Sequence, residues 1–116
     1  MTGLSRGDVV LVWFPNSDLV TFKRRSALVV EADNLNTGVL QVVVPMITNN
    51  LARHGHPSRV FIALNSPEAR DAGLRTDSLV MTDNLATVLD KAIAVKLGSL
   101  KNMTSVNAAL RHTLGL

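Results

Sequence analysis

The apolar residues of this chain form short runs, and this arrangement restricts the fold more than any other feature of the sequence. The runs are rich in β-branched residues, are bounded by polar turns, and cover residues 9–14, 26–31, 39–47, 60–64 and 78–81, with shorter pieces between 86 and 100. Runs of this length between turn residues are typical of β-strands. The second and third are expected to be antiparallel neighbours across a turn at 33–38.

The end of the chain has a helical period instead. Its apolar residues recur at the spacing of one helix face, at Met103, Val106, Leu110 and Leu114. Asn102 is the expected N-cap and Gly115 the expected C-terminal stop. Many short strands followed by one helix predict a mainly β protein, a small, strongly curved barrel of about five to seven strands, and not a βαβ fold.

Composition narrows the classes of protein to which the chain can belong. A chain of 116 residues, 47% of them apolar, fits a single domain over 1–116 with an aliphatic core. The absence of cysteine excludes disulfides and thiolate metal sites. The first residues lack the apolar region of a signal peptide, and no run reaches membrane-spanning length, so we expect a soluble cytoplasmic protein. The net charge of +3 is compatible with RNA, DNA or an acidic protein partner.

Three cations, Lys23, Arg24 and Arg25, directly precede the second apolar run. Guanidinium groups at such a junction are positioned by the core yet remain in water, and their planar donors suit phosphate. The alternative is a solvated strand end whose charges keep an edge soluble. Thr48 follows the third run, where Pro45 indicates a bend or strand end; its hydroxyl serves either chemistry or a structural cap.

Cleavage of an RNA phosphodiester by its own 2′-OH suits these residue types. The 2′-OH loses a proton, the 5′ oxygen gains one, and charge on the phosphoryl oxygens is stabilised. Because RNA supplies the nucleophile, neither a metal nor a cofactor is needed. Arg25 fits charge stabilisation, and its high pKa excludes it as an ordinary base at neutral pH.

The polar loop 49–59 carries the two histidines best placed for acid–base chemistry, His54 and His56. They are candidates for general acid and base or for a weak metal pair, although two ligands without a third are a poor metal signal. The alternative is a solvated basic loop that touches phosphates or nothing. His112, on the polar side of the C-terminal helix, is expected to have no role.

The fifth run is expected to stop at residues 82–84, which include Asp83. Three interpretations of Asp83 are open: it orients Arg25, accepts a hydrogen bond from a base edge, or forms an Asx-turn. The sequence contains no Gly-rich phosphate loop, no Gly-x-Ser-x-Gly elbow and no His-Glu-x-x-His motif. Kinase, serine hydrolase and glycosidase activities therefore have no support.

Taken in order, these segments resemble the MazF/PemK family of toxins. The motifs that carry the resemblance are residues 7–12, 24–30 and 44–50, followed by 57–64, 73–74, 78–83, 97–98 and the tail 106–116. The resemblance implies a homodimeric SH3-like barrel with a C-terminal helix. It also implies a type II toxin that cleaves single-stranded RNA at short sequences, without metal and through a 2′,3′-cyclic phosphate. A cognate antitoxin would block the RNA site of such a toxin with an extended segment.

The resemblance also assigns roles to residues. The family's catalytic Arg and Thr fall on Arg25 and Thr48, Asp83 falls on an acidic position of some active sites, and His54 or His56 are candidates to assist. The RNA-binding residues implied by the matching segments are Asn16, Ser17, Phe22, Lys23, Arg24, Asn49, Asn50, Arg53 and Arg59.

Two departures from the family pattern are Ser26, where Pro is usual, and Met81, where some members have Arg. The alternatives are a non-catalytic toxin of the same fold that binds a protein such as DNA gyrase, and a catalytically decayed member. The C-terminal residues 114–116 offer nothing distinctive for the former.

Overall fold

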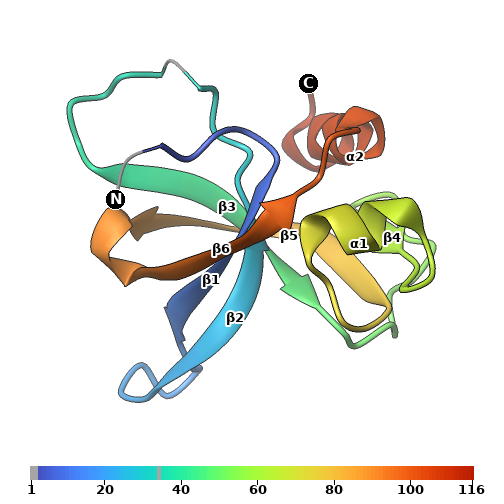
Figure 1. Ribbon diagram of the computed structural model, residues 1–116, viewed down its shortest axis with the longest axis horizontal. Helices are drawn as coiled ribbons and strands as arrows, with labels where there is room; N and C mark the ends of the chain where they lie inside the picture. Colours follow the sequence, from blue (N-terminus) through green and yellow to red (C-terminus); the bar gives the residue numbers. More distant parts are fainter. Residues whose placement is uncertain (1–2, 34) are drawn as a thin grey trace.

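In the computed structural model, which describes residues 3–33 and 35–116, six antiparallel strands form one sheet (Figure 1). The strand order is β4-β5-β3-β2-β1-β6. The elements are β1 (Asp8–Pro15), β2 (Phe22–Leu28), β3 (Gln41–Thr48), β4 (Arg59–Ile62), α1 (Pro67–Ala72), β5 (Ser78–Leu89), the 3-10 turn η1 (Asp90–Ala92), β6 (Ile93–Ser99) and α2 (Thr104–Leu114). The predicted mainly β, strongly curved fold with a C-terminal helix is confirmed. Among the described residues no ladder joins β4 to β6, so the barrel is open.

The core lies on both sides of the sheet, which explains the nearly continuous apolar run of β1. Val9 belongs to one buried cluster, which also receives side chains from α1 and α2. Val10 and Val12 belong to a second cluster with Ala27 and Met46. Successive side chains of a strand point to opposite faces, so a strand buried on both faces has no polar positions to alternate.

Several predicted boundaries were wrong. The second strand begins at Phe22, so Lys23, Arg24 and Arg25 lie within β2 rather than before it, in unbroken register with β1. The predicted stop at 82–84 is a bulge: β3–β5 pairing passes from Pro45 opposite Leu85 to Met46 opposite Met81, and β5 continues beyond the extra residues. A bulge bends a strand without ending it.

The helix ends follow local chemistry. Helix α1 is capped by the Ser66 hydroxyl, which accepts the Ala69 N–H at 3.2 Å. Met103 rather than Asn102 is the N-cap of α2, although Asn102 Oδ1 accepts the Thr104 N–H at 3.1 Å. Gly115 ends α2 in the left-handed region, as predicted.

The predicted turn at 33–38 includes Asn34, which lies outside the described residues, as do Met1 and Thr2. None of the described helices is long and apolar enough to cross a membrane.

Gly73 ends α1 and lies against Leu97 of β6, and its replacement by Ala is expected to destabilise the fold by about 2 kcal/mol or more. Its φ is 71°, and an added Cβ would collide with the carbonyl oxygen of Leu97. Gly38 is the matched control, because its φ is 82° but a Cβ there would have no atom within 4 Å. Urea unfolding of both Ala variants separates backbone strain from collision, and equal losses would refute the collision.

Candidate functional site

Arg25 and Thr48 lie on neighbouring strands at matching positions. Ala27 of β2 pairs with Met46 of β3 in antiparallel register. Continued two residues farther along both strands, this register brings Arg25 level with Thr48. Residues opposite each other in an antiparallel pair project from the same face. On its other side Arg25 pairs with the buried Val12 of β1, so the strand beneath the guanidinium is fixed by a core residue.

Both side chains line one pocket of about 480 Å³. Four cations contribute to its wall, namely Lys23, Arg24, Arg25 and Arg75, and no lining residue is acidic. The full lining comprises Leu11, Lys23, Arg24, Arg25, Ser26, Ile47, Thr48, Asn49, Gly73, Leu74, Arg75, Thr76, Ser78 and Leu97. Such a wall suits a ligand with several negative charges, because clefts lined by one sign of charge concentrate the opposite sign.

The Thr48 hydroxyl is held by the turn that ends β3. Its Oγ1 accepts the backbone N–H of Asn50 at 3.1 Å, and Asn50 Oδ1 in turn accepts the N–H of Ala52 at 3.0 Å. Thr48 therefore is a structural cap, one of the two roles expected for it. Because the hydroxyl accepts in this bond, its own proton stays available for donation into the pocket.

Arg75 was missed by the sequence analysis. It lies between α1 and β5 and reaches the pocket because β5 pairs with β3 beside Thr48. A cation just before a buried strand is the same local signal that singled out Arg25. Its placement beside Arg25, however, depends on which strands are neighbours.

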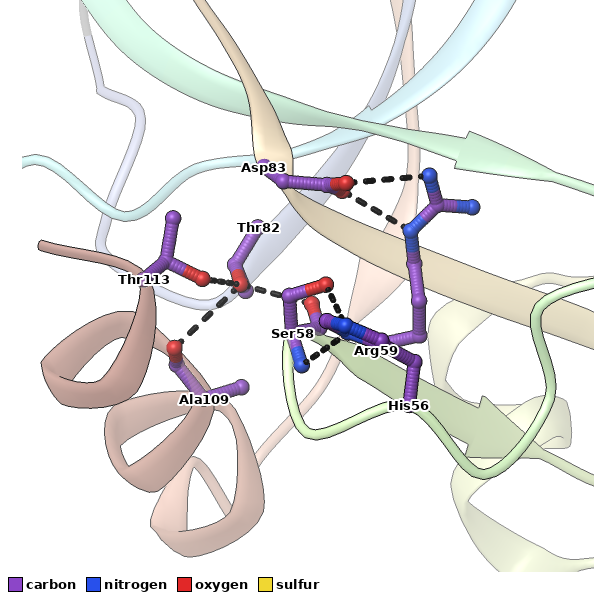
Figure 2. Close-up of polar contacts among 7 residues, drawn as sticks. All are labelled: His56, Ser58, Arg59, Thr82, Asp83, Ala109 and Thr113. Atoms are coloured by element: carbon purple, nitrogen blue, oxygen red, sulfur yellow. Dashed lines mark hydrogen bonds and ion pairs between the residues drawn. The ribbon is translucent and has the colours of Figure 1, made fainter.

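Asp83 lies outside this pocket and pairs with Arg59 (Figure 2). Arg59 Nε and Nη2 donate to the two carboxylate oxygens at 2.8 and 3.1 Å. These hydrogen bonds hold the pKa of Asp83 below its usual range. The preceding residue points the other way in Figure 2: Thr82 Oγ1 donates to the Ser58 carbonyl at 2.6 Å and lies 2.8 Å from Thr113 Oγ1 of α2. Within the bulge, Asp83 thus holds Arg59 and Thr82 holds α2.

Neither His54 nor His56 lines the pocket. The His54 ring packs against Phe61, with centroids 4.3 Å apart. His56 Nδ1 lies 2.7 Å from Ser58 Oγ, and its ring is edge-on to His112 at 6.3 Å. Within the described residues no group of three His, Asp or Glu side chains is arranged to hold a metal ion.

The structure places some of the other predicted RNA-binding residues in the pocket wall and the rest elsewhere. Lys23, Arg24 and Asn49 line the pocket. Asn16, Ser17 and Phe22 lie in the β1–β2 hairpin, Asn50 and Arg53 lie in the β3–β4 loop, and Arg59 begins β4. Asn16 Nδ2 donates to Thr21 Oγ1 at 2.9 Å and so shapes the hairpin tip, which projects away from α2 in Figure 1.

Comparison with known proteins identifies a family that matches this chain. The family model described as a PemK-like, MazF-like toxin of type II toxin–antitoxin systems matches residues 5–114. No curated protein matches the chain in sequence.

Among solved structures, an endoribonuclease from a Mycobacterial species is 24% identical, with a TM-score of 0.72 over 100% of this chain and 95% of that one. A Mycobacterial endoribonuclease in complex with its cognate antitoxin is 22% identical, with a TM-score of 0.73 over 98% and 97%. A MazE–MazF structure from Deinococcus radiodurans is 18% identical, with a TM-score of 0.71 over 97% of each chain. Likeness at these identities shows a shared fold.

Proposed function

The chain belongs to the PemK-like, MazF-like toxins of type II toxin–antitoxin systems, and we propose that it is an endoribonuclease that cleaves single-stranded RNA. One observation carries the proposal: a guanidinium and a fixed hydroxyl, Arg25 and Thr48, share a pocket with three further cations and no carboxylate. Phosphodiester cleavage needs this pairing of charge and hydrogen-bond donors around a phosphate.

In the proposed reaction the 2′ oxygen attacks the adjacent phosphorus and the bond to the 5′ oxygen breaks. The products are a 2′,3′-cyclic phosphate and a 5′-OH end. Arg25 stabilises the charge that develops on the phosphoryl oxygens, and Thr48 donates a hydrogen bond to them. No residue in the pocket wall is a histidine or a carboxylic acid. Water therefore takes the 2′-OH proton and supplies the proton of the leaving oxygen. RNA brings its own nucleophile, so the scheme uses no metal.

The two departures from the family pattern leave this pocket intact. Ser26 pairs with Leu11 within the unbroken β1–β2 register, so the strand continues through the position where the family usually has proline. Met81 is half-buried, packs against a core cluster and pairs with Met46, so this position supplies an apolar side chain and no cation. In the proposed scheme Arg75 provides the second guanidinium from a different segment.

The proposal extends to partners. A cognate antitoxin would inhibit by laying an extended segment with acidic residues over the cationic pocket. One solved structure of the same fold is an endoribonuclease in complex with its cognate antitoxin. By analogy with the family we further propose that the chain recognises a short RNA sequence and forms a homodimer. With cellular mRNA as its proposed substrate, the chain would act in the cytoplasm.

Replacing Arg75 by Ala is expected to lower kcat/KM for a single-stranded oligoribonucleotide about ten-fold, because a phosphate loses one of its cations. The slope of log kcat/KM against log salt should also become shallower by roughly 0.7. Initial rates in EDTA at several salt concentrations measure both. Arg70→Ala is the control, since Arg70 is exposed on α1 and does not line the pocket. Equal rates for the two variants would remove Arg75 from the site.

A further inference from the structure

Trp13, the only tryptophan of the chain, lies on β1 with 44% of its surface exposed. It follows the fully buried Val12 near the end of β1, and its indole belongs to neither core cluster. Trp13 pairs with Arg24 of β2, whose guanidinium carbon lies 5.0 Å from the ring centroid. This cation–π contact restrains a large aromatic surface that the core does not use.

Arg24 connects the indole to the proposed catalytic pocket. The same Arg24 side chain that lies over Trp13 also lines the pocket of Arg25 and Thr48. A chain molecule bound there and continuing past Arg24 meets the indole next. Because consecutive nucleotides alternate phosphate and base, cations followed by an exposed aromatic ring fit the order of groups along single-stranded nucleic acid.

Trp13 also borders a second pocket of about 370 Å³. Its wall includes Phe14 and, from β5, Ala86 and Val88. Lys91 is the only charged residue that the described part of the chain contributes to this wall. The guanidinium of Arg24 covers only one face of a ring that has two. An apolar, aromatic pocket with one cation at its wall suits a flat heterocycle joined to a phosphate.

We infer that Trp13 and this second pocket form a base-binding subsite, in which an unpaired nucleotide next to the cleaved phosphate stacks on the indole while Lys91 contacts its phosphate. This inference rests on the proposed function. The two pockets together present Lys23, Arg24, Arg25, Arg75 and Lys91 without a carboxylate. That charge favours a polyanion over an apolar protein surface as the occupant.

The single tryptophan makes the test site-specific, because stacking of a base quenches indole fluorescence. The probes are short 2′-O-methyl oligoribonucleotides of each base, which cannot be cleaved, and an abasic sugar-phosphate chain of equal length. We expect saturable quenching by at least one base-bearing probe and none by the abasic chain, whose binding is followed by anisotropy of a label.

Variants measured with the same labelled probes supply the second arm. Trp13→Ala should weaken binding of the quenching probe about ten-fold and leave the abasic chain unaffected, and Trp13→Phe should retain affinity within about two-fold. Circular dichroism establishes that both variants are folded. Quenching that is absent, or equal with the abasic chain, overturns the subsite. A change of fluorescence with protein concentration alone overturns it too, because the pocket would then be an interface between copies of the chain.

Cleavage of unmodified RNA by the same preparation separates the two proposals. Cleavage without base-dependent quenching refutes the Trp13 subsite and leaves the nuclease. Base-dependent quenching without cleavage refutes the nuclease and leaves a site that binds single-stranded nucleic acid.

Discussion

The Arg25→Ala variant is expected to cleave single-stranded RNA at least about 100-fold more slowly than the unaltered protein. Arg25 is the cation placed opposite Thr48 by the β2–β3 register, so its loss removes the charge that stabilises the phosphoryl oxygens. The effect should fall mainly on kcat, because Lys23, Arg24 and Arg75 still attract the substrate. Single-turnover rates on a labelled oligoribonucleotide measure it.

Two matched variants make the result specific. Arg25→Lys keeps the charge but loses the planar fork of donors, and we expect it to recover only part of the rate. Arg111→Ala removes one positive charge from the exposed face of α2, away from the pocket, and should cleave at the normal rate. Full activity in Arg25→Ala, with its thermal unfolding unchanged, would exclude Arg25 from the reaction.

Thr48→Val is expected to have the second largest effect, a loss of about 10- to 100-fold in kcat. Valine keeps the shape of threonine but removes the donor to the phosphate and the acceptor of the Asn50 N–H. The lost turn bond should cost about 1 kcal/mol of unfolding free energy, which urea unfolding measures separately from the rate.

Thr48→Ser is the matched control, because it keeps the hydroxyl in both of its roles. Serine restores both hydrogen bonds, so its cleavage rate should lie within a few-fold of threonine. If valine lowers stability and leaves the rate unchanged, Thr48 is only the cap of the β3 turn.

The fold was predictable as far as local patterns decide it. Short β-branched runs and the helical period from Met103 to Leu114 indicated the strands and α2 correctly. The start of β2 was not predictable, because Lys23, Arg24 and Arg25 show no apolar alternation. They are extended since they pair residue by residue with β1, and such tertiary pairing overrides local preference.

The candidate site was predictable only in part, for the same reason. Arg25 and Thr48 were proposed from their types and from the family resemblance, and the β2–β3 register places them opposite each other. The pairing of Asp83 with Arg59 arises from a bulge in β5 and from the β4–β5 register. No local pattern specifies which distant strands become neighbours, so this ion pair and the position of Arg75 required the structure.

The first experiment should incubate the purified protein with a long single-stranded RNA in EDTA and map the fragment ends by sequencing. We expect cuts at one short sequence that leave 2′,3′-cyclic phosphate and 5′-OH ends. Intact RNA from folded protein would contradict the nuclease and favour a toxin that acts by binding a protein target. Cleavage that appears only after a divalent metal replaces EDTA would contradict the metal-independent reaction at Arg25 and Thr48.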